Sequence, residues 1–382
     1  MQNKEELSLY IHIPFCVRKC GYCDFLSAPA DEKARDRYVQ ALLMEIERYR
    51  GTETADRKIK TLYIGGGTPS TLSVKQLECI MQKIKCTFNF HGDMETSMEM
   101  NPGTASKEKC RALYQMGINR LSIGLQSTND MELKTLGRIH SYEDFLNTYT
   151  WCREAGFQNI NVDLMAALPY QTVESYTTGL RKIIRLAPEH ISAYSLILEE
   201  GTPFYQKYNS GCYPLPDEEQ ERLMYRETEQ ILAQAGYERY EISNYAKKGL
   251  ECRHNKGYWQ RTDYLGLGLG ASSLVDHVRF SNTDNMEEYL RNSAFPEKIR
   301  CDRETLTEAD EMAEFMFLGL RMTEGVSVRE FEEYFGKNME SIYGEVLKKH
   351  FALGMLKKKN DRIFLTRRGI HVSNGVMADF LL

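Results

Sequence analysis

Short apolar runs alternate along the chain with longer stretches in which apolar residues recur at helical spacing. The runs are rich in β-branched residues, as buried parallel strands are. Six runs predict strands, at residues 7–15, 60–65, 95–100, 120–125, 159–164 and 190–198. Six amphipathic stretches predict helices, at residues 31–49, 73–86, 106–116, 142–155, 173–186 and 216–235. The first part of the chain is therefore expected to consist of strand–helix units.

The ends of the predicted helices carry local signals. Ser73 and Ser106 are expected N-caps, because a serine hydroxyl can accept a hydrogen bond from an unpaired N–H of the first turn. Gly117, Gly156 and Gly236 follow three helices, and glycine adopts at little cost the left-handed backbone that ends a helix. The alternation predicts right-handed parallel crossovers in one barrel-like or doubly wound sheet, with ligands at the carboxyl ends of the strands.

The rhythm changes after residue 236. Short strand-like pieces follow, with a glycine-rich stretch at 265–270. From Thr307 the pattern predicts three helices and then two strands within 357–366, which turn at Asn360-Asp361. We therefore predict three regions: residues 1–236, an extension at 237–300, and a smaller α+β winged-helix-like domain at 301–382.

The composition is that of a soluble globular protein, with 42% hydrophobic and 27% charged residues. The net charge of -5 gives no general attraction to nucleic acid or anionic lipid. A winged helix could bind a duplex, but its basic residues are local, so no nucleic-acid partner is expected. Residues 1–7 lack a signal-peptide core, and no later stretch approaches the roughly 18 apolar residues of a membrane span, which predicts a cytoplasmic location.

Three of the ten cysteines, Cys16, Cys20 and Cys23, crowd together directly after the first strand. Thiolates are ligands for zinc and for iron–sulfur clusters. A zinc site usually needs a fourth Cys or His in a paired arrangement, and the sequence holds no second pair of that kind. Three thiolates on a [4Fe-4S] cluster leave one iron open to bind a small molecule.

The C-x-x-x-C-x-x-C spacing after a strand resembles the radical S-adenosylmethionine (SAM) superfamily. The string Tyr10-Ile-His-Ile-Pro-Phe-Cys16 resembles the oxygen-independent coproporphyrinogen III oxidase group within it. The resemblance covers nearly the whole chain and implies a partial (β/α)6 barrel, a [4Fe-4S] cluster on the three cysteines, SAM and an electron donor. In this superfamily an electron from the cluster cleaves SAM to methionine and a 5′-deoxyadenosyl radical.

The residues at the strand ends match SAM-binding positions of that family. Gly66, Gly67 and Thr68 end the second strand, where residues without Cβ let the backbone approach a ligand, and the resemblance assigns them to the amino group of SAM. An ordinary glycine turn is the alternative. The resemblance implies further SAM or cluster contacts for Tyr10, Tyr22, Glu99, Gln126, Arg138 and Asp163, with Glu99 and Asp163 near the ribose and Arg138 on the carboxylate. Taken singly, each also fits a structural hydrogen bond or a core aromatic.

Two features separate the chain from the oxidases. They carry a fourth cysteine two residues after the third, where this chain has Phe25, and a longer N-terminal region. Residues 253–259 contain the H-N-x-x-Y-W signature of a closely related family of heme chaperones. The resemblance therefore implies heme binding and delivery to acceptor proteins such as respiratory-chain components, with any membrane association peripheral and through these acceptors.

His254 of that signature is the predicted heme ligand, because an imidazole can bind heme iron while Tyr258 and Trp259 cover the porphyrin. The alternative is that His254 belongs to a hydrogen-bond network at a domain junction. His12 and His140 are further candidates. Whether the protein cleaves SAM in its working cycle, and so acts as an enzyme, stays open at this point.

Overall fold

The computed structural model describes residues 5–381, apart from the side chain of His91. Parallel strands pair in chain order: β1 (Glu6–Ile13), β2 (Lys58–Gly66), β3 (Asn89–Met100), β4 (Arg120–Gln126), β5 (Ile160–Ala166) and β6 (His190–Ser195). All six predicted strands are confirmed. Side chains such as Leu9, Ile11 and Val162 are apolar and fully buried in one core with residues of the surrounding helices, which is why the sequence contains recurring apolar runs.

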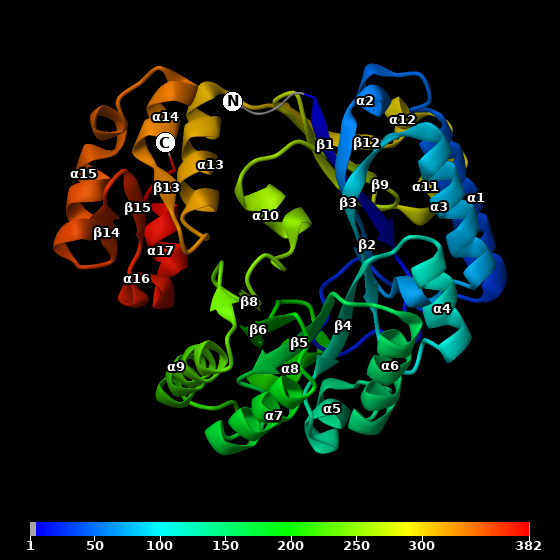
Figure 1. The fold of residues 1–382 in the computed structure, drawn as a ribbon, viewed down its shortest axis with the longest axis horizontal. Coiled ribbons are helices and arrows are strands. Elements are labelled where there is room, and N and C mark those ends of the chain that lie inside the picture. The colour runs from blue at the N-terminus through cyan, green and yellow to red at the C-terminus, as the bar shows by residue number, and fades with distance from the viewer. Residues whose placement is uncertain (1–4, 382) are drawn as a thin grey trace.

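Helices cover the outer face of these strands (Figure 1). The predicted helices are confirmed as α1 (Glu32–Glu47), α3 (Val74–Thr87), α4 (Lys107–Gln115), α6 (Tyr142–Ala155), α7 (Val173–Arg185) and α9 (Glu218–Gln234). Shorter helices lie between them: α2 (Glu53–Asp56), α5 (Asp130–Leu136) and α8 (Pro203–Asn209). The side chains of Ser73 and Ser106 cap α3 and α4 as expected. Gly156 ends α6 in the left-handed conformation.

Antiparallel strands extend the sheet at both edges. Beside β1 lies β9 (Tyr264–Leu267), which is parallel to it, followed by β10 (Ser272–Val275), β11 (Val278–Asn282) and β12 (Arg300–Thr305). Beside β6 lie β8 (Asn244–Ala246) and β7 (Glu238–Arg239). The order of the twelve-stranded sheet begins at β12 and ends at β7, so over residues 5–381 the barrel is open.

One short helix, α10 (Arg253–Trp259), lies between the barrel strands and the C-terminal region (Figure 1). It contacts β2 on one side and α13 (Glu308–Gly319) on the other. The segment between β11 and β12 forms α11 (Met286–Asn292) and α12 (Pro296–Ile299). The extension therefore builds one edge of the large sheet and also supplies a helix at the open side of the barrel.

The C-terminal region has its own core, which includes Met316, Phe331 and Tyr343. Its elements after α13 are β13 (Val326–Ser327), α14 (Val328–Phe335), α15 (Met339–Ala352), β14 (Leu356–Lys359), β15 (Arg362–Leu365), α16 (Arg367–His371) and α17 (Ser373–Ala378). Three helices and a hairpin turning at Asn360-Asp361 form the predicted winged-helix pattern. β12 pairs with β11, so the large sheet continues as far as Thr305. The domain boundaries at residues 236 and 300 stay predictions.

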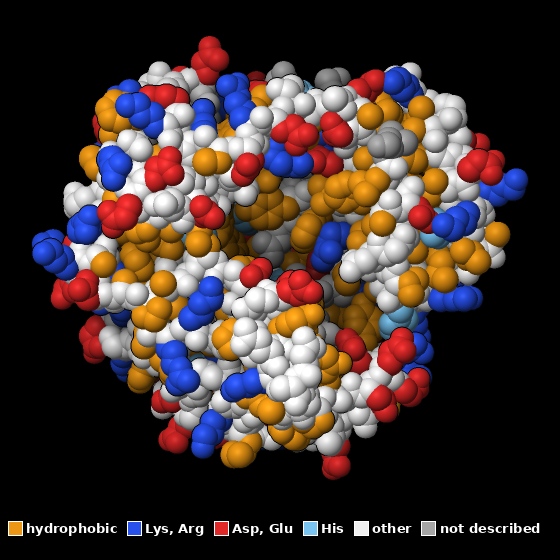
Figure 2. All heavy atoms as spheres, turned by 180° about the vertical axis from the view of Figure 1, so that it is seen from behind, with side chains coloured by type: hydrophobic (Ala, Val, Ile, Leu, Met, Phe, Trp, Pro, Cys, Tyr) orange, Lys and Arg blue, Asp and Glu red, His pale blue; other side chains and the backbone are white. Residues whose placement is uncertain are grey.

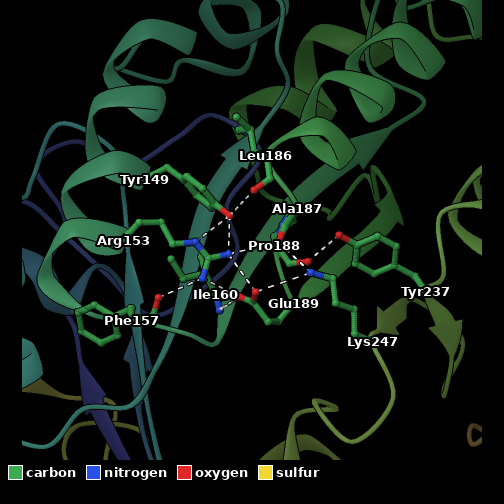
Figure 3. A network of polar contacts seen from close by, with 10 residues as sticks. All are labelled: Tyr149, Arg153, Phe157, Ile160, Leu186, Ala187, Pro188, Glu189, Tyr237 and Lys247. Atoms are coloured by element: carbon green, nitrogen blue, oxygen red, sulfur yellow. Dashed lines mark hydrogen bonds and ion pairs between the residues drawn. The ribbon is translucent and has the colours of Figure 1, made fainter.

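A polar network holds the amino ends of β5 and β6 together (Figure 3). The Glu189 carboxylate pairs with Arg153 at 2.8 Å, accepts the backbone N–H of Ile160 at 3.0 Å and lies 3.7 Å from Lys247. Arg153 also donates to the backbone carbonyl of Phe157 at 3.0 Å. Structural contacts therefore occupy the amino ends of β5 and β6, and ligands are expected at the carboxyl ends of the strands.

The molecular surface mixes charges of both signs. Figure 2 shows one face on which acidic and basic side chains are interspersed around a hollow near its centre. Hydrophobic side chains gather inside the hollow. A hollow of this kind is where a small-molecule site is expected.

Candidate functional site

A cavity of about 320 Å³ runs from the carboxyl ends of the barrel strands into the barrel, and is called here the main cavity. Most residues predicted to bind the cluster or SAM line it: Cys16, Cys20, Tyr22, Cys23, Gly66, Gly67, Thr68, Glu99, Gln126, Arg138 and Asp163. Tyr10 and His254 are not among the lining residues. The fold therefore brings together thiols, glycines and ionisable groups that lie far apart in the sequence.

The three thiols stand on a loop whose base is fixed. The Cys16 N–H donates to the carbonyl of Ala28 at 3.1 Å, which ties the two ends of the loop together. All three cysteines are free. Among residues 5–381 no three His, Cys, Asp or Glu side chains converge on one point as ligands of a single ion do; the thiolates of a cubane bind three separate irons. Three soft donors beside a polar cavity fit a [4Fe-4S] cluster with an open iron.

Gly66 and Gly67 lie so close to the end of β1 and the residues after it that neither position leaves room for a Cβ atom. Gly66 has φ +108°, and a Cβ there would lie 2.6 Å from the His12 ring. A Cβ on Gly67 would lie 2.6 Å from the carbonyl oxygen of Phe15. His12 is held in place by hydrogen bonds to the Tyr10 hydroxyl at 3.0 Å and to the carbonyl of Leu26 at 2.9 Å. Tyr10 therefore supports the cavity wall through His12.

Two carboxyl groups share the middle of the main cavity. Glu99 accepts hydrogen bonds from the Tyr63 hydroxyl at 3.0 Å and from the Gly66 N–H at 3.1 Å. Burial, and then the nearby Asp163, raise the pKa of Glu99 to about 7. Burial also raises the pKa of Asp163, which accepts from the Asn161 amide at 2.7 Å. Each carboxyl group can accept a hydrogen bond from a ligand hydroxyl.

Arg138 lies beside the thiols. Its guanidinium lies 3.8 Å from the Cys20 sulfur and donates to Asn101 at 2.7 Å and to the carbonyl of Gly124. Gln126, with φ 74°, accepts from the Tyr194 hydroxyl at 3.0 Å. A planar guanidinium at this position suits a carboxylate bound next to the cluster.

His254 turns away from the main cavity. It is 1% exposed, with Nδ1 2.7 Å from the Thr61 hydroxyl and Nε2 2.9 Å from the Tyr258 hydroxyl. Its ring stacks on Tyr63 with centroids 5.1 Å apart. Burial lowers its pKa to about 3, which keeps the imidazole neutral. Because both nitrogens are engaged, iron ligation by His254 requires one of these bonds to break, and this role stays a prediction.

The other histidine candidates are also bonded inside the protein. His140 lies 3.2 Å from the carbonyl of Leu125, and burial lowers its pKa to about 4. His12 faces Gly66. The structure therefore places His12 and His140 in supporting positions around the cluster loop and the glycine run.

Several lining residues were missed at the level of sequence. Asn255, the residue after His254, lines the main cavity, and so do Arg120, Asn101 and Tyr194. Asn255 could have been found, because it belongs to the same H-N-x-x-Y-W signature. Nothing in the sequence marks Arg120, which begins a predicted strand and reads as a surface residue.

A second space separates the barrel from the C-terminal region, and is called here the interdomain cleft. It has a volume of about 490 Å³. Its walls include Trp259, Phe315, Met322 and Tyr334, with Arg261 beside them. Trp259 packs under the Arg321 guanidinium, which lies 4.2 Å from the ring centroid. The last residue of α10 thus forms part of the wall of this cleft.

Within the described part of the chain, no helix combines the length and the apolar character needed to span a bilayer.

Known proteins resemble this chain over its whole length. The profile of the Radical SAM superfamily matches residues 10–210, and that of the HemN C-terminal domain matches residues 306–372. Heme chaperone HemW of Lactococcus lactis is 37% identical over 98% of this chain and 97% of the relative. HemW of Bacillus subtilis is 37% identical over 98% and 99%, and HemW of Escherichia coli is 34% identical over 98% of each.

A solved structure shows the same fold. Coproporphyrinogen III oxidase (HemN) from Escherichia coli superposes with a TM-score of 0.87 at 25% identity, covering 100% of this chain and 91% of that one. The fold class expected from the sequence, a partial radical SAM barrel with a smaller C-terminal domain, is confirmed.

Proposed function

The chain belongs to the radical SAM superfamily and, within it, to the heme chaperone HemW family, and we propose from this premise that it binds heme and delivers it to acceptor proteins. The observation that carries the proposal is the nearly full-length similarity to several HemW proteins. Phe25, where the oxidases have a fourth cysteine, and the intact H-N-x-x-Y-W helix support the same function.

The family implies a [4Fe-4S] cluster and SAM as cofactors. When bound, the cluster supplies the electron that cleaves SAM. Cys16, Cys20 and Cys23 would hold it. Glu99 and Asp163 would accept hydrogen bonds from the ribose hydroxyls of SAM. The cavity walls orient the cosubstrate and exclude water.

The guanidinium of Arg138 would pair with the carboxylate of SAM, next to Gln126 at the end of β4. The Gly66–Thr68 turn would take the amino group, because Gly66 and Gly67 have no side chains of their own to keep a ligand from the backbone. Tyr22 packs edge-on against Phe204, with centroids 6.4 Å apart, and so forms an apolar wall beside the cluster loop. These roles stay proposals for each residue.

For heme, α10 and the interdomain cleft are the proposed location. Trp259 and Phe315 offer flat apolar surfaces of the kind that cover a porphyrin. His254, five residues earlier on α10, stays the predicted ligand after release from Thr61 or Tyr258. The acceptor proteins, the electron donor and the cytoplasmic location also belong to this proposal.

The test is a heme titration of the anaerobically purified, cluster-reconstituted protein, followed by absorption spectroscopy and run beside an assay of coproporphyrinogen III turnover. We expect stoichiometric heme binding and no turnover. Formation of the oxidase product would overturn the chaperone proposal. It would favour the alternative, an oxygen-independent coproporphyrinogen III oxidase or another radical SAM enzyme that acts on a tetrapyrrole.

Two variants separate the cofactor roles. Cys20→Ala should lose the brown chromophore and SAM cleavage, since the cluster loses a thiolate ligand. His254→Ala should keep both and weaken heme uptake, with His371→Ala on α16 as the matched control. Normal heme uptake by His254→Ala would refute the ligand assignment.

A further inference from the structure

Arg120 is a buried charge without a direct partner. It is 2% exposed and lines the main cavity. Its guanidinium makes no hydrogen bond or ion pair to any residue between 5 and 381, and its Nε is fully enclosed. Burying an unpaired charge is expensive, so a side chain held in this way needs something in the cavity to bond with it.

Arg120 lies deeper in the barrel than the residues proposed to bind SAM. The strand register pairs Glu99 with Ser122 and Asp163 with Gly124. Arg120 lies two residues nearer the amino end of β4, which is about 7 Å further into the barrel. The length of β4 from Gln126 to Arg120 is roughly 20 Å. The main cavity is therefore longer than the part that the SAM residues line.

The inner floor of the main cavity is polar. It is formed by Arg120, Asn161, Ser192, Asn244 and Asn255, which come from β4, β5, β6, β8 and α10. Asn161 and Ser192 are bonded to each other at 3.1 Å. The side-chain amide of Asn255 has no hydrogen bond within the described residues. Arg120 and Asn255 are therefore the two floor residues whose side chains make no hydrogen bond within the described part of the chain.

The nearby carboxylates are already engaged. Glu95 interacts electrostatically with Arg120, but its oxygens accept the backbone N–H groups of Arg253 at 2.9 Å and His254 at 3.1 Å. Asp163 accepts from Asn161 at 2.7 Å and from Ser122 at 3.3 Å. These groups reduce the field of the guanidinium without bonding to it, and they disfavour a doubly charged group such as hydrogen phosphate more than a singly charged carboxylate group.

We infer that the inner floor is a binding subsite for a carboxylate group of a small-molecule ligand, with Arg120 and Asn255 as its donors. The planar fork of an arginine matches the two oxygens of a carboxylate, and an asparagine amide adds a third hydrogen bond. The subsite lies on the far side of Glu99 and Asp163 from the thiols. It does not rest on heme binding, and a heme titration tests the chaperone proposal separately.

The experiment is calorimetric titration of the reconstituted full-length protein with succinate, with and without SAM. Wild type should bind succinate, and Arg120→Gln should weaken binding about tenfold or more, as expected for loss of charge-assisted hydrogen bonds. Asn255→Ala should weaken it by a smaller factor. The matched control is Lys256→Ala, the next residue of α10, which does not line the cavity and should leave binding unchanged.

Three outcomes would overturn the inference: no succinate binding to wild type, equal binding to wild type and Asn255→Ala, or displacement of succinate by an equal concentration of inorganic phosphate. If circular dichroism shows that Arg120→Gln does not fold, the inference is tested by comparing succinate binding by Asn255→Ala with that by Lys256→Ala. A structure with succinate bound should place a carboxylate against both Arg120 and Asn255, and succinate bound elsewhere would also refute the subsite.

Discussion

Glu99 shares the main cavity with the carboxyl group of Asp163, and this arrangement determines how it responds to pH. Burial and then Asp163 raise the pKa of Glu99 from 4.5 to about 7. A raised carboxyl pKa means that the folded state favours the protonated form. The contribution of Glu99 to the free energy of unfolding is therefore fully present below about pH 4.5 and is lost as the pH rises to about 7.

Glu99→Gln should remove this dependence. In the SAM-free protein, the stability of wild type relative to Glu99→Gln should fall by about 3 kcal/mol between pH 4.5 and pH 8, because the ionised carboxylate loses solvation in the cavity. Chemical unfolding at several pH values measures the difference. Glu154→Gln, which removes an exposed carboxylate paired with Lys107, is the control. An equal pH dependence in the two variants would contradict the expectation.

At the level of elements, the end of β2 depends on the absence of side chains. Gly66→Ala should destabilise the protein by about 2 kcal/mol, since φ +108° is strained for alanine and the new Cβ meets the His12 ring. Gly344→Ala is the matched control: this glycine lies within α15 with nothing near its Cβ position, and alanine there should stabilise by up to about 1 kcal/mol. Thermal unfolding distinguishes the two, and equal effects would refute the contact argument.

The network around Glu189 makes a second prediction for the elements. Glu189→Ala should cost about 3 kcal/mol, because it leaves Arg153 and the Ile160 N–H without their partner at the amino ends of β5 and β6. Lys107→Ala removes an exposed pair with Glu154 and should change stability by less than about 1 kcal/mol. Urea unfolding of both variants measures the contrast, and a loss in Glu189→Ala no larger than in the control would contradict it.

The sequence predicted the regular elements of the barrel well and the extension poorly. Long strands and helices carry repeated apolar positions, so β1 to β6 and their helices were found within a few residues, except that β3 begins six residues before the predicted run. Elements such as β7 and β8 are too short for a pattern; β8 is fixed by its pairing with β6, and β7 by its pairing with β8. The hairpin at Asn360-Asp361 was predicted because its turn residues have a distinct chemistry.

The same limit applies to the candidate site. Glu99 and Asp163 were predicted because they lie near the carboxyl ends of predicted parallel strands and match SAM-binding positions of the radical SAM family. For α10 the sequence could not tell which face meets the cavity. His254 bonds to Thr61, and the adjacent Asn255 lines the cavity instead. Such a choice depends on contacts with β2 and β3, which lie far away in the sequence.

At the scale of the whole molecule, ion pairs connect the extension to the C-terminal region. Glu314 of α13 is buried and accepts from Arg261 at 3.1 Å and from Arg279. Glu314→Ala should leave both guanidinium groups without this partner and destabilise the junction by about 3 kcal/mol. Limited proteolysis between residues 300 and 310 should become faster.

The control for this junction is Glu308→Ala, which removes an exposed pair with Lys337 inside the C-terminal region. Its proteolysis rate should match that of wild type. If Glu314→Ala is cleaved no faster than Glu308→Ala, the ion pairs do not hold the two regions together.

One helix, α10, borders two separate spaces: Asn255 lines the main cavity and Trp259 lines the interdomain cleft. Ligands in the two spaces that displace this helix are thermodynamically linked, and each must change the dissociation constant of the other by the same factor. A titration with SAM at several heme concentrations therefore measures whether α10 couples binding in the main cavity to binding in the interdomain cleft.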